Sequence, residues 1–318
     1  MGRTPYPVAG QKRRQPSFDK GRPSPDDTPG DTSDKSVVNN SEDRENRVKI
    51  SNNLEEACEG HPRSWEALSE PQRAALARRL VVEPTHRLIF CPAPLHASSA
   101  WLKVLLFLAT ANSSRRYVNP GKVPAVAAAN RSNHAYLADL PPSRQADVLR
   151  THRSFLVVRH PLTRLAVAYL QKFQQSNPSF AAAYGRYIVQ HYRSGAGALA
   201  DSDGTDVEFH EFVRYLADVE DQESMNEHWQ PLGILCRLCA VQYDRLVHFR
   251  EMEAEGTAML QQFGLGGQVQ AVPPADRWEH VAGEVVKALY SSLSPALLAR
   301  LVQRYKADVQ LLGYTSRV

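Results

Sequence analysis

Residues 154 to 173 read SFLVVRHPLTRLAVAYLQKF, and this stretch decides the fold. Phe155 to Val158 form a short apolar run of the kind that makes a buried strand, and Pro161 stands where the first turn of a helix would begin. Apolar residues then recur at helical spacing as far as Phe173, which leaves one helix face apolar. The sequence therefore predicts a buried strand, a short loop and a helix.

Arg159 falls in that short loop, beside the predicted start of the helix. Free backbone N–H groups and the helix dipole favour an anion at such a position, and an arginine adds a matching charge. The alternative is a salt-bridging arginine after an ordinary strand. The other segments have to decide between the two.

Length and composition set wide limits. The chain has 318 residues, of which 42% are hydrophobic and 23% charged, as is usual for a soluble globular protein with a sizeable core. The formal net charge of +4 suits an anionic nucleotide or a polyanionic glycan, and it suits nucleic acid as well. Charge alone therefore excludes none of these ligands.

Residues 1–52 are rich in Pro, Gly, Ser, Asp and Lys and poor in aliphatic residues. Such a segment cannot bury enough apolar surface to offset its ordering entropy, so we expect a disordered tail or stem there and a folded domain over 53–318. The sequence shows no signal-peptide core, and its longest apolar run, Val104 to Ala109, is too short to span a bilayer. As it stands, the sequence predicts a soluble chain.

A second strand–loop–helix unit precedes the first. One or two helices are expected between Asn53 and Val82, and a strand from Arg87 to Phe90. The loop CPAPLHASS follows, and then a buried helix that Ser98 or Ser99 would cap. This is the geometry of a phosphate-binding loop, but GxxxxGK[ST] is missing, which argues against a phosphate-loop kinase. Alternating strands and helices predict an α/β domain with a central parallel sheet flanked by helices.

Three segments together resemble the Golgi carbohydrate sulfotransferases, the family that includes the chondroitin, dermatan, N-acetylgalactosamine 4-O- and HNK-1 sulfotransferases. They are RHPLTRLAVAY from Arg159, CPAPLHASSAW from Cys91, and NEHWQPLGILCRLCAVQYDRLVHFREME from Asn226. The C-terminal segment with Tyr305, Asp308, Gly313 and Tyr314 also fits. The resemblance covers about residues 54 to 315. It implies a P-loop-like, nucleotide-binding sulfotransferase fold, with 3′-phosphoadenosine 5′-phosphosulfate as co-substrate and no metal.

The resemblance also assigns residues to the co-substrate. The 5′-phosphosulfate segment and the 3′-phosphate segment map onto Pro94, Leu95, His96, Ala97, Ser98, Ser99, Ala100, Arg159, His160, Pro161, Arg164 and Val167. Three of these depart from the family pattern: Leu95 stands at the motif lysine, Ala100 at an asparagine and Val167 at a serine. Removing one preorganised electrostatic contact typically costs about 100- to 1,000-fold in rate. Nucleotide binding and turnover are therefore separate questions for this chain.

Sulfuryl transfer to a sugar hydroxyl needs a general base, and Glu227 and His228 are the candidates for it. A histidine beside a tryptophan is also common as a purely structural residue. By resemblance, Arg131, His134 and Arg150 approach the acceptor, although a solvated basic surface would explain them equally well.

Two functions follow. The first is a carbohydrate O-sulfotransferase that acts on a glycan or proteoglycan acceptor, with no nucleic-acid partner. The second is a catalytically silent homologue that binds glycan or nucleotide without turnover. By resemblance the protein belongs to the Golgi lumen or membrane, and membrane association requires an N-terminal anchor that this sequence does not contain.

The four cysteines leave several options open. Cys236 and Cys239 form a CxxC, which fits half a zinc site or a redox pair, whereas four cysteines in an oxidising lumen would make two disulfides. The sequence does not give their pairing. Asn39, Asn112 and Asn130 each begin an N-x-[ST] glycosylation sequon, as expected for a secretory glycoprotein.

Overall fold

The structure is a computed structural model, which describes residues 56–111, 113, 117–175, 177–193 and 202–315. The predicted tail, together with the sequons at Asn39 and Asn112, lies outside the described residues, so the boundary near residue 53 stays a prediction. The third sequon residue, Asn130, is exposed.

A five-stranded sheet organises the described residues, in the order β3-β1-β2-β4-β5. Strands β2, β4 and β5 run parallel, whereas β1 pairs antiparallel with both β2 and β3. The α/β class and the flanked sheet are confirmed, and the sheet is mixed. The strands are β1 (Val81–Glu83), β2 (Leu88–Phe90), β3 (Ala135–Tyr136), β4 (Arg153–Val158) and β5 (Arg245–His248).

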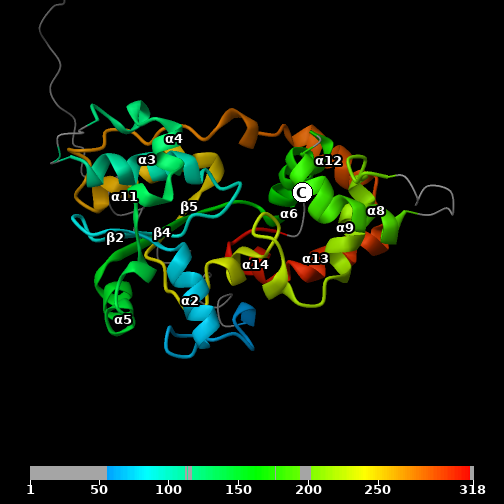
Figure 1. Cartoon of the computed structure of the whole chain (residues 1–318), viewed down its shortest axis with the longest axis horizontal. Coiled ribbons are helices and arrows are strands. Elements are labelled where there is room, and N and C mark those ends of the chain that lie inside the picture. Colours follow the sequence, from blue (N-terminus) through cyan, green and yellow to red (C-terminus); the bar gives the residue numbers. More distant parts are fainter. Residues whose placement is uncertain (1–55, 112, 114–116, 176, 194–201, 316–318) are drawn as a thin grey trace, which may run out of the picture. The chain divides into compact units, whose positions relative to one another are not determined.

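Side-chain alternation along β4 buries both faces of the sheet. Phe155 and Val157 join the apolar cluster beneath α3 (Ser98–Ala109), α4 (Ala125–Ala129) and α11 (Met252–Gln262). Leu156 and Val158 join the cluster on the other face, with α2 (Glu70–Arg79), α5 (Pro142–Thr151), α10 (Leu232–Leu235) and α14 (Lys306–Leu311). Figure 1 shows α3, α4 and α11 on one side of the strands and α2 and α5 on the other.

A third apolar cluster gathers helices beyond the carboxyl end of β4. Its largest fully buried rings are those of Trp229, Tyr305, Phe173 and Phe212. The helices are α6 (Pro161–Tyr169), α8 (Arg186–Tyr192), α9 (Phe209–Asp218), α12 (Gly283–Ser291) and α13 (Pro295–Arg304), with the short α7 (Pro178–Phe180) and π-helical turns at Leu170–Gln174 and Ala181–Gly185. These helices lie together in Figure 1.

Local sequence explains most helix starts. Ser69 and Gln72 form a capping box at α2, His160 caps α6 ahead of Pro161, and Ser294 caps α13. The prediction for α3 was wrong, because its N-cap is Ala97 and neither Ser98 nor Ser99 caps it. The helix predicted up to Val82 also ends earlier, at Arg79, because the β-branched residues that follow pair as β1 with β2.

The four cysteines form two disulfides, Cys58–Cys239 and Cys91–Cys236. The expectation of two disulfides is confirmed, and the CxxC cysteines pair with distant partners and not with each other. In the part of the chain that the structure describes, no single helix has the length and apolar composition to cross a bilayer. One pair, α12 with α13, meets that test only when taken together, and it bends by 117°.

Candidate functional site

The loop between β2 and α3 has a strained backbone. Leu95 has φ of 69° and Ala97 has φ of 53°, in the left-handed region that residues with a side chain rarely adopt. Such residues concentrate at functional sites. The turn directs the Leu95 side chain, only 3% exposed, into the apolar cluster around α6, so Leu95 faces the core.

The polar groups of this loop bond to protein atoms. Ser98 Oγ donates to Ala93 O at 2.6 Å, and Ser99 Oγ donates to Asp276 Oδ2 at 2.7 Å. The backbone N–H of Ala97 donates to Glu279 Oε2 at 2.7 Å. Ala100 is buried and Pro94 half-buried.

His96 is buried in the same loop, with 1% of its surface exposed. Its Nδ1 lies 2.9 Å from Pro94 O, so in the neutral ring Nδ1 carries the proton and Nε2 the lone pair. Nε2 has no hydrogen-bond partner among the described residues. Burial holds the pKa of His96 well below its ordinary value, and the charges of Arg164 and Arg159 lower it further.

Arg159, at the end of β4, clamps the loop. Its guanidinium donates to Leu95 O at 3.2 Å and to Glu279 O at 2.7 Å, and it stacks on Phe249 with 4.2 Å to the ring centroid. Burial lowers the pKa of Arg159 to about 10, so the group stays charged at neutral pH. One side of Arg159 therefore holds the loop in place.

The other side of Arg159 faces a cavity of about 570 Å³ beyond the carboxyl ends of β4 and β5. Ligands of open α/β sheets bind at this edge, and the volume suits a small-molecule ligand. The charged and titratable residues of its lining, among those described, are Arg159, Arg250, Lys287, His160, His248, His280, Glu251 and Tyr314. Cations outnumber carboxylates, so the cavity favours an anion.

Other predicted 3′-phosphate residues lie outside this lining. Arg164 is 2% exposed and donates to Gln230 O at 2.6 Å and to Glu227 O, which anchors that segment to α6. Val167 is fully buried in the core, and Pro161 opens α6. His160 does line the cavity, and its Nε2 donates to Thr315 O at 2.9 Å.

The two candidate bases have different environments. Glu227 forms an ion pair with Arg79 at 2.8 Å; burial alone would raise the pKa of the Glu227 carboxyl, but Arg79 brings it below its ordinary value. His228 Nδ1 donates to Asn226 Oδ1 at 2.8 Å, which leaves the Nε2 lone pair as the acceptor. Burial lowers the pKa of His228 to about 4, with a further contribution from Lys172. His228 is therefore neutral at physiological pH and able to accept a proton.

Three connections hold the Asn226–Gln230 segment next to the loop. Arg79 donates to Pro92 O at 3.1 Å as well as to Glu227. The Cys91–Cys236 disulfide joins the first residue of the loop to the helix after the segment. The charge of Arg164, which binds that segment, also acts on His96. These contacts place the Asn226–Gln230 segment beside the loop.

The predicted acceptor contacts lie elsewhere on the surface. Arg131 donates to Arg78 O and stacks on Tyr136 at 3.5 Å, and His134 Nε2 donates to Ala128 O at 2.7 Å. Arg150 is exposed and lies 3.5 Å from Asp147. None of the three is in the lining of the cavity described above.

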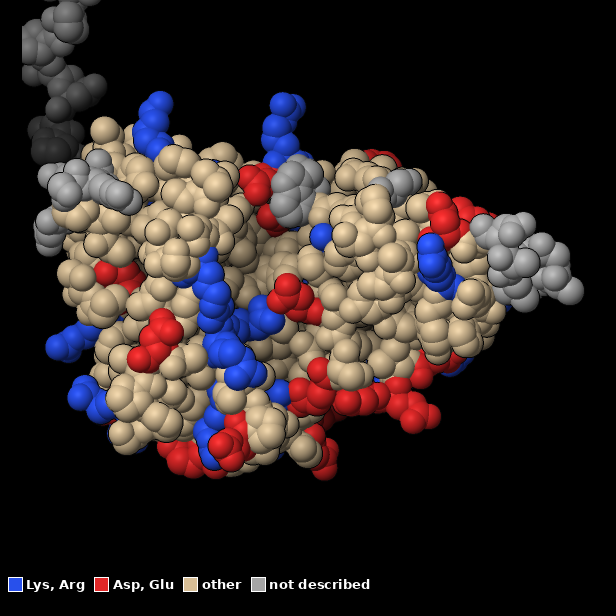
Figure 2. All heavy atoms as spheres, viewed as in Figure 1, with Lys and Arg blue, Asp and Glu red and all other residues tan. Residues whose placement is uncertain are grey.

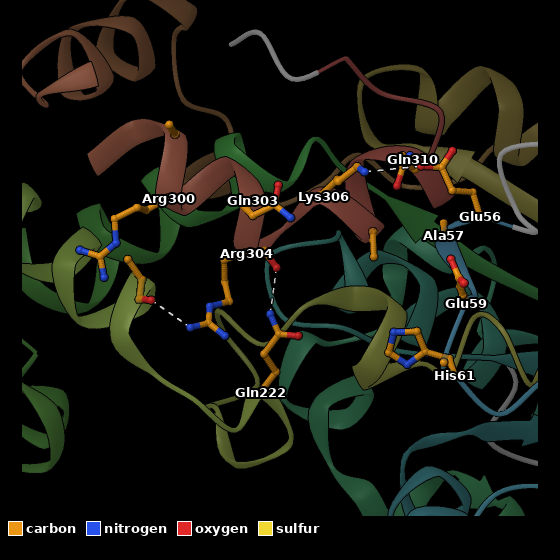
Figure 3. A pocket seen from close by; sticks show the side chains of 14 residues that line it. Glu56, Ala57, Glu59, His61, Gln222, Arg300, Gln303, Arg304, Lys306 and Gln310 are labelled. Carbon is orange, nitrogen blue, oxygen red and sulfur yellow. Dashed lines mark hydrogen bonds and ion pairs between the residues drawn. The ribbon is translucent and has the colours of Figure 1, made fainter. Parts of the chain in front are cut away.

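A larger hollow of about 980 Å³ lies along α13 and α14 (Figure 3). Its cations already have protein partners: Arg300 pairs with Asp218, Lys306 with Glu56 at 3.4 Å, and Arg304 donates to Ala217 O at 2.9 Å. It shares no residue with the loop or the 570 Å³ cavity. The smaller cavity is therefore the better candidate. Figure 2 shows a face hollowed between the helices around the sheet and those around α6, bordered by charged side chains.

The sequence model described as "Sulfotransferase family" matches residues 78–315. The chain belongs to the sulfotransferase family. Carbohydrate sulfotransferase 14 of Danio rerio is 34% identical over 256 residues, which is 80% of this chain and 66% of the relative. Its Homo sapiens counterpart is 35% identical over 80% of this chain and 65% of its own. Carbohydrate sulfotransferase 11 of Mus musculus is 31% identical over 75% of this chain and 67% of the relative.

The chain thus spans slightly less than two thirds of the first two of these relatives, at 66% and 65% of their lengths. No solved structure matches it significantly.

Several residues of the site escaped the sequence reasoning. Arg250 and Lys287 are exposed cations that look like ordinary surface residues in the sequence. Arg250 lies two residues after β5, so the rule that ligands bind beyond the carboxyl ends of parallel strands would have identified it. Asp276 and Glu279 carry no comparable signal, because their contacts with the loop join positions more than 170 residues apart.

Proposed function

We propose that this member of the sulfotransferase family is a carbohydrate O-sulfotransferase. It moves a sulfuryl group from 3′-phosphoadenosine 5′-phosphosulfate to a hydroxyl of a glycosaminoglycan or an N-acetylgalactosamine-containing chain. The observation that carries the proposal is the cation-lined cavity beyond β4 and β5. It lies next to the loop between β2 and α3, and the segment with the candidate base His228 lies beside that loop. The names of the relatives support the carbohydrate acceptor.

The cavity suits the nucleotide half of the donor. Arg159, Arg250 and Lys287 supply positive charge for the 3′-phosphate, and the rings of Phe249 and Tyr314 supply apolar surface for the adenosine. The 5′ end of the nucleotide then points along the loop toward the start of α3, where the helix dipole favours negative charge once the carboxylates of Asp276 and Glu279 have left the loop's donors.

His228 acts as the base in this proposal. As the acceptor oxygen forms a bond to sulfur, its proton passes to Nε2 of His228, and the bond between sulfur and the 5′-phosphate oxygen breaks. Adenosine 3′,5′-bisphosphate leaves with the bonding electrons. The positive end of α3 and the guanidinium of Arg79 stabilise the departing charge, since the buried Leu95 cannot.

The test is incubation with labelled donor and a panel of desulfated chondroitin, dermatan and N-glycan acceptors. Wild type should label at least one acceptor, and His228→Gln should lose about 100- to 10,000-fold, the usual contribution of a general base. His191→Gln is the matched control, because His191 bonds to Tyr187 O at 2.8 Å and belongs to none of the candidate sites. Wild-type product no greater than that of a heat-killed sample would refute the enzymatic function.

Two observations favour the second candidate, a silent homologue that binds nucleotide or glycan. Leu95 faces the core where the family has a lysine, and Asp276 and Glu279 accept from the loop's donors. This candidate predicts calorimetric binding of adenosine 3′,5′-bisphosphate without turnover on any acceptor. Measured turnover would eliminate it.

The proposed place of action is the Golgi lumen, with glycans or proteoglycans and not nucleic acid as partners. Two disulfides suit that oxidising compartment. A fusion to a fluorescent protein, made from the full-length gene, tests the localisation, and a cytosolic signal would contradict it.

A further inference from the structure

Two carboxylates from one short segment lie on the loop that the donor would use. Glu279 Oε2 accepts from the N–H of Ala97, and Asp276 Oδ2 accepts from Ser99 Oγ, each at 2.7 Å. The segment that carries them, Asp276 to Glu279, connects α11 to α12 and follows the loop by more than 170 residues in sequence. The start of α3 is therefore already occupied by negative groups of the protein.

Glu279 is held firmly in this position. It is 2% exposed, and Arg159 binds its backbone oxygen at 2.7 Å while also binding Leu95 O of the loop. The charged groups that act on the Glu279 carboxyl are Arg159, which attracts it, and Asp276, which repels it. A buried carboxylate needs hydrogen-bond donors, and the loop N–H is the donor that it uses.

A phosphate or sulfate at the start of α3 would need the same donors. It would also meet the negative charges of both carboxylates, and like charges brought together without water between them repel strongly. Arg250 and Lys287, by contrast, are exposed in the cavity and form no ion pair with a carboxylate of the described residues. The two halves of the nucleotide site therefore differ: the cavity attracts an anion, and the loop repels one.

We propose that Glu279, with Asp276, determines the ligand specificity of the site: in this conformation it accepts an adenosine nucleotide through its 3′-phosphate and disfavours a group with a 5′-phosphate or 5′-phosphosulfate. A 5′-charged ligand enters once the Asp276–Glu279 segment withdraws or its carboxylates are neutral. The inference rests on the proposed nucleotide function of the cavity. It adds that the carboxylates of Asp276 and Glu279 compete with the charged end of the donor for the hydrogen-bond donors of the loop.

Calorimetry with adenosine 3′-monophosphate and adenosine 3′,5′-bisphosphate tests this. Wild type should bind the bisphosphate only slightly more tightly than the monophosphate. Glu279→Gln, which keeps the shape and removes the charge, should bind the bisphosphate at least about tenfold more tightly and leave monophosphate affinity unchanged. Asp276→Asn should act in the same direction. Glu284→Gln is the matched control, because it removes the same charge from an exposed position on α12.

Two results would overturn the inference in different ways. If wild type strongly prefers the bisphosphate and Glu279→Gln changes nothing, the specificity role is wrong and the nucleotide function stands. If neither wild type nor variant binds either nucleotide, both the function and the inference fail. Thermal unfolding checks that each variant is folded. If Glu279→Gln does not fold, the affinity of wild type for each nucleotide is measured at pH 8 and at pH 6 instead. A rise in affinity toward pH 6 that is steeper for the bisphosphate than for the monophosphate supports the role of Glu279. An equal rise for both nucleotides refutes it.

Discussion

His228 Nδ1 lies 2.8 Å from Oδ1 of Asn226, and the amide of Asn226 in turn donates to the hydroxyl of Tyr184 at 3.1 Å. The backbone N–H of His228, which only donates, also bonds to Oδ1 at 3.0 Å, so this end of the amide is the oxygen, and an amide oxygen only accepts. Nδ1 therefore carries the proton and Nε2 the lone pair. Asn226 thus sets the tautomer that a base needs before any substrate arrives.

Asn226→Ala should lower kcat and leave the KM for the nucleotide donor nearly unchanged, because Asn226 acts through His228 and contacts no nucleotide in the proposal. The loss should be part of the 100- to 10,000-fold attributed roughly to a general base. Asn226→Asp keeps an accepting oxygen and should retain more activity than the alanine variant. Steady-state kinetics on both decide the point, and equal losses would contradict a role in setting the tautomer.

Arg250→Ala and Lys287→Ala should each weaken binding of adenosine 3′,5′-bisphosphate by roughly 10- to 100-fold, as expected for a hydrogen bond to a charged group. Both side chains are exposed, so their removal should leave folding intact. The salt dependence of binding should fall as well, since one phosphate contact is lost.

Arg300→Ala provides the control for this pair, because Arg300 lines the larger hollow and pairs with Asp218. Calorimetry should show wild-type affinity for it. If Arg300→Ala weakens binding as much as Lys287→Ala, the nucleotide does not bind in the smaller cavity.

Glu279 should make folding depend on pH. Burial raises the pKa of its carboxyl to about 6 from an ordinary 4.5. Between these values the folded chain binds the proton more tightly than the unfolded chain, so stability falls as pH rises through this range and the full penalty remains above it. From the shift, the penalty is about 2 kcal/mol at most.

Glu279→Gln should therefore raise the melting temperature relative to wild type at pH 8 and have little effect at pH 4. Scanning calorimetry at both pH values measures this, with Glu284→Gln as a variant expected to show no such difference. A gain of the same size at pH 4 and pH 8 would mean that titration of Glu279 is not its source.

The two disulfides should contribute similar amounts to the free energy of unfolding. They should differ in their effect on nucleotide affinity. They join residues 145 and 181 positions apart, and removing either should cost roughly 2 to 5 kcal/mol. The double variant Cys91→Ser, Cys236→Ser should also weaken nucleotide binding, because Cys91 is the first residue of the loop. Cys58→Ser with Cys239→Ser should destabilise the fold and leave affinity nearly intact. Equal effects on affinity would contradict this distinction.

The sequence predicted the elements whose signals are local. The apolar run before Arg159, Pro161 at the first turn of α6, and Ser294 before Pro295 each lie within a few residues of the structure that they specify. The antiparallel β1 escaped prediction because its first residues, Val81 and Val82, continue the pattern interpreted as a helix, and β3 because two residues show no period.

The site was predictable only as far as its motifs reach. Arg159 was identified by its position after a strand and His160 by the family resemblance, and both line the cavity. The turn of Leu95 into the core depends on a left-handed backbone that nothing in CPAPLHASS signals. The contact between Ala97 and Glu279 depends on how two distant segments pack, which one sequence does not encode in any local pattern.

The buried position of Leu95 also determines whether a lysine can be introduced there. Its side chain packs against α6 in a cluster with Leu162 and Leu165, so Leu95→Lys would place an ammonium group among aliphatic side chains. We expect that variant to unfold at a lower temperature and to gain no activity. A lysine at position 95 therefore requires a different loop conformation, whereas Arg79 already brings a cation to the loop through its bond to Pro92 O.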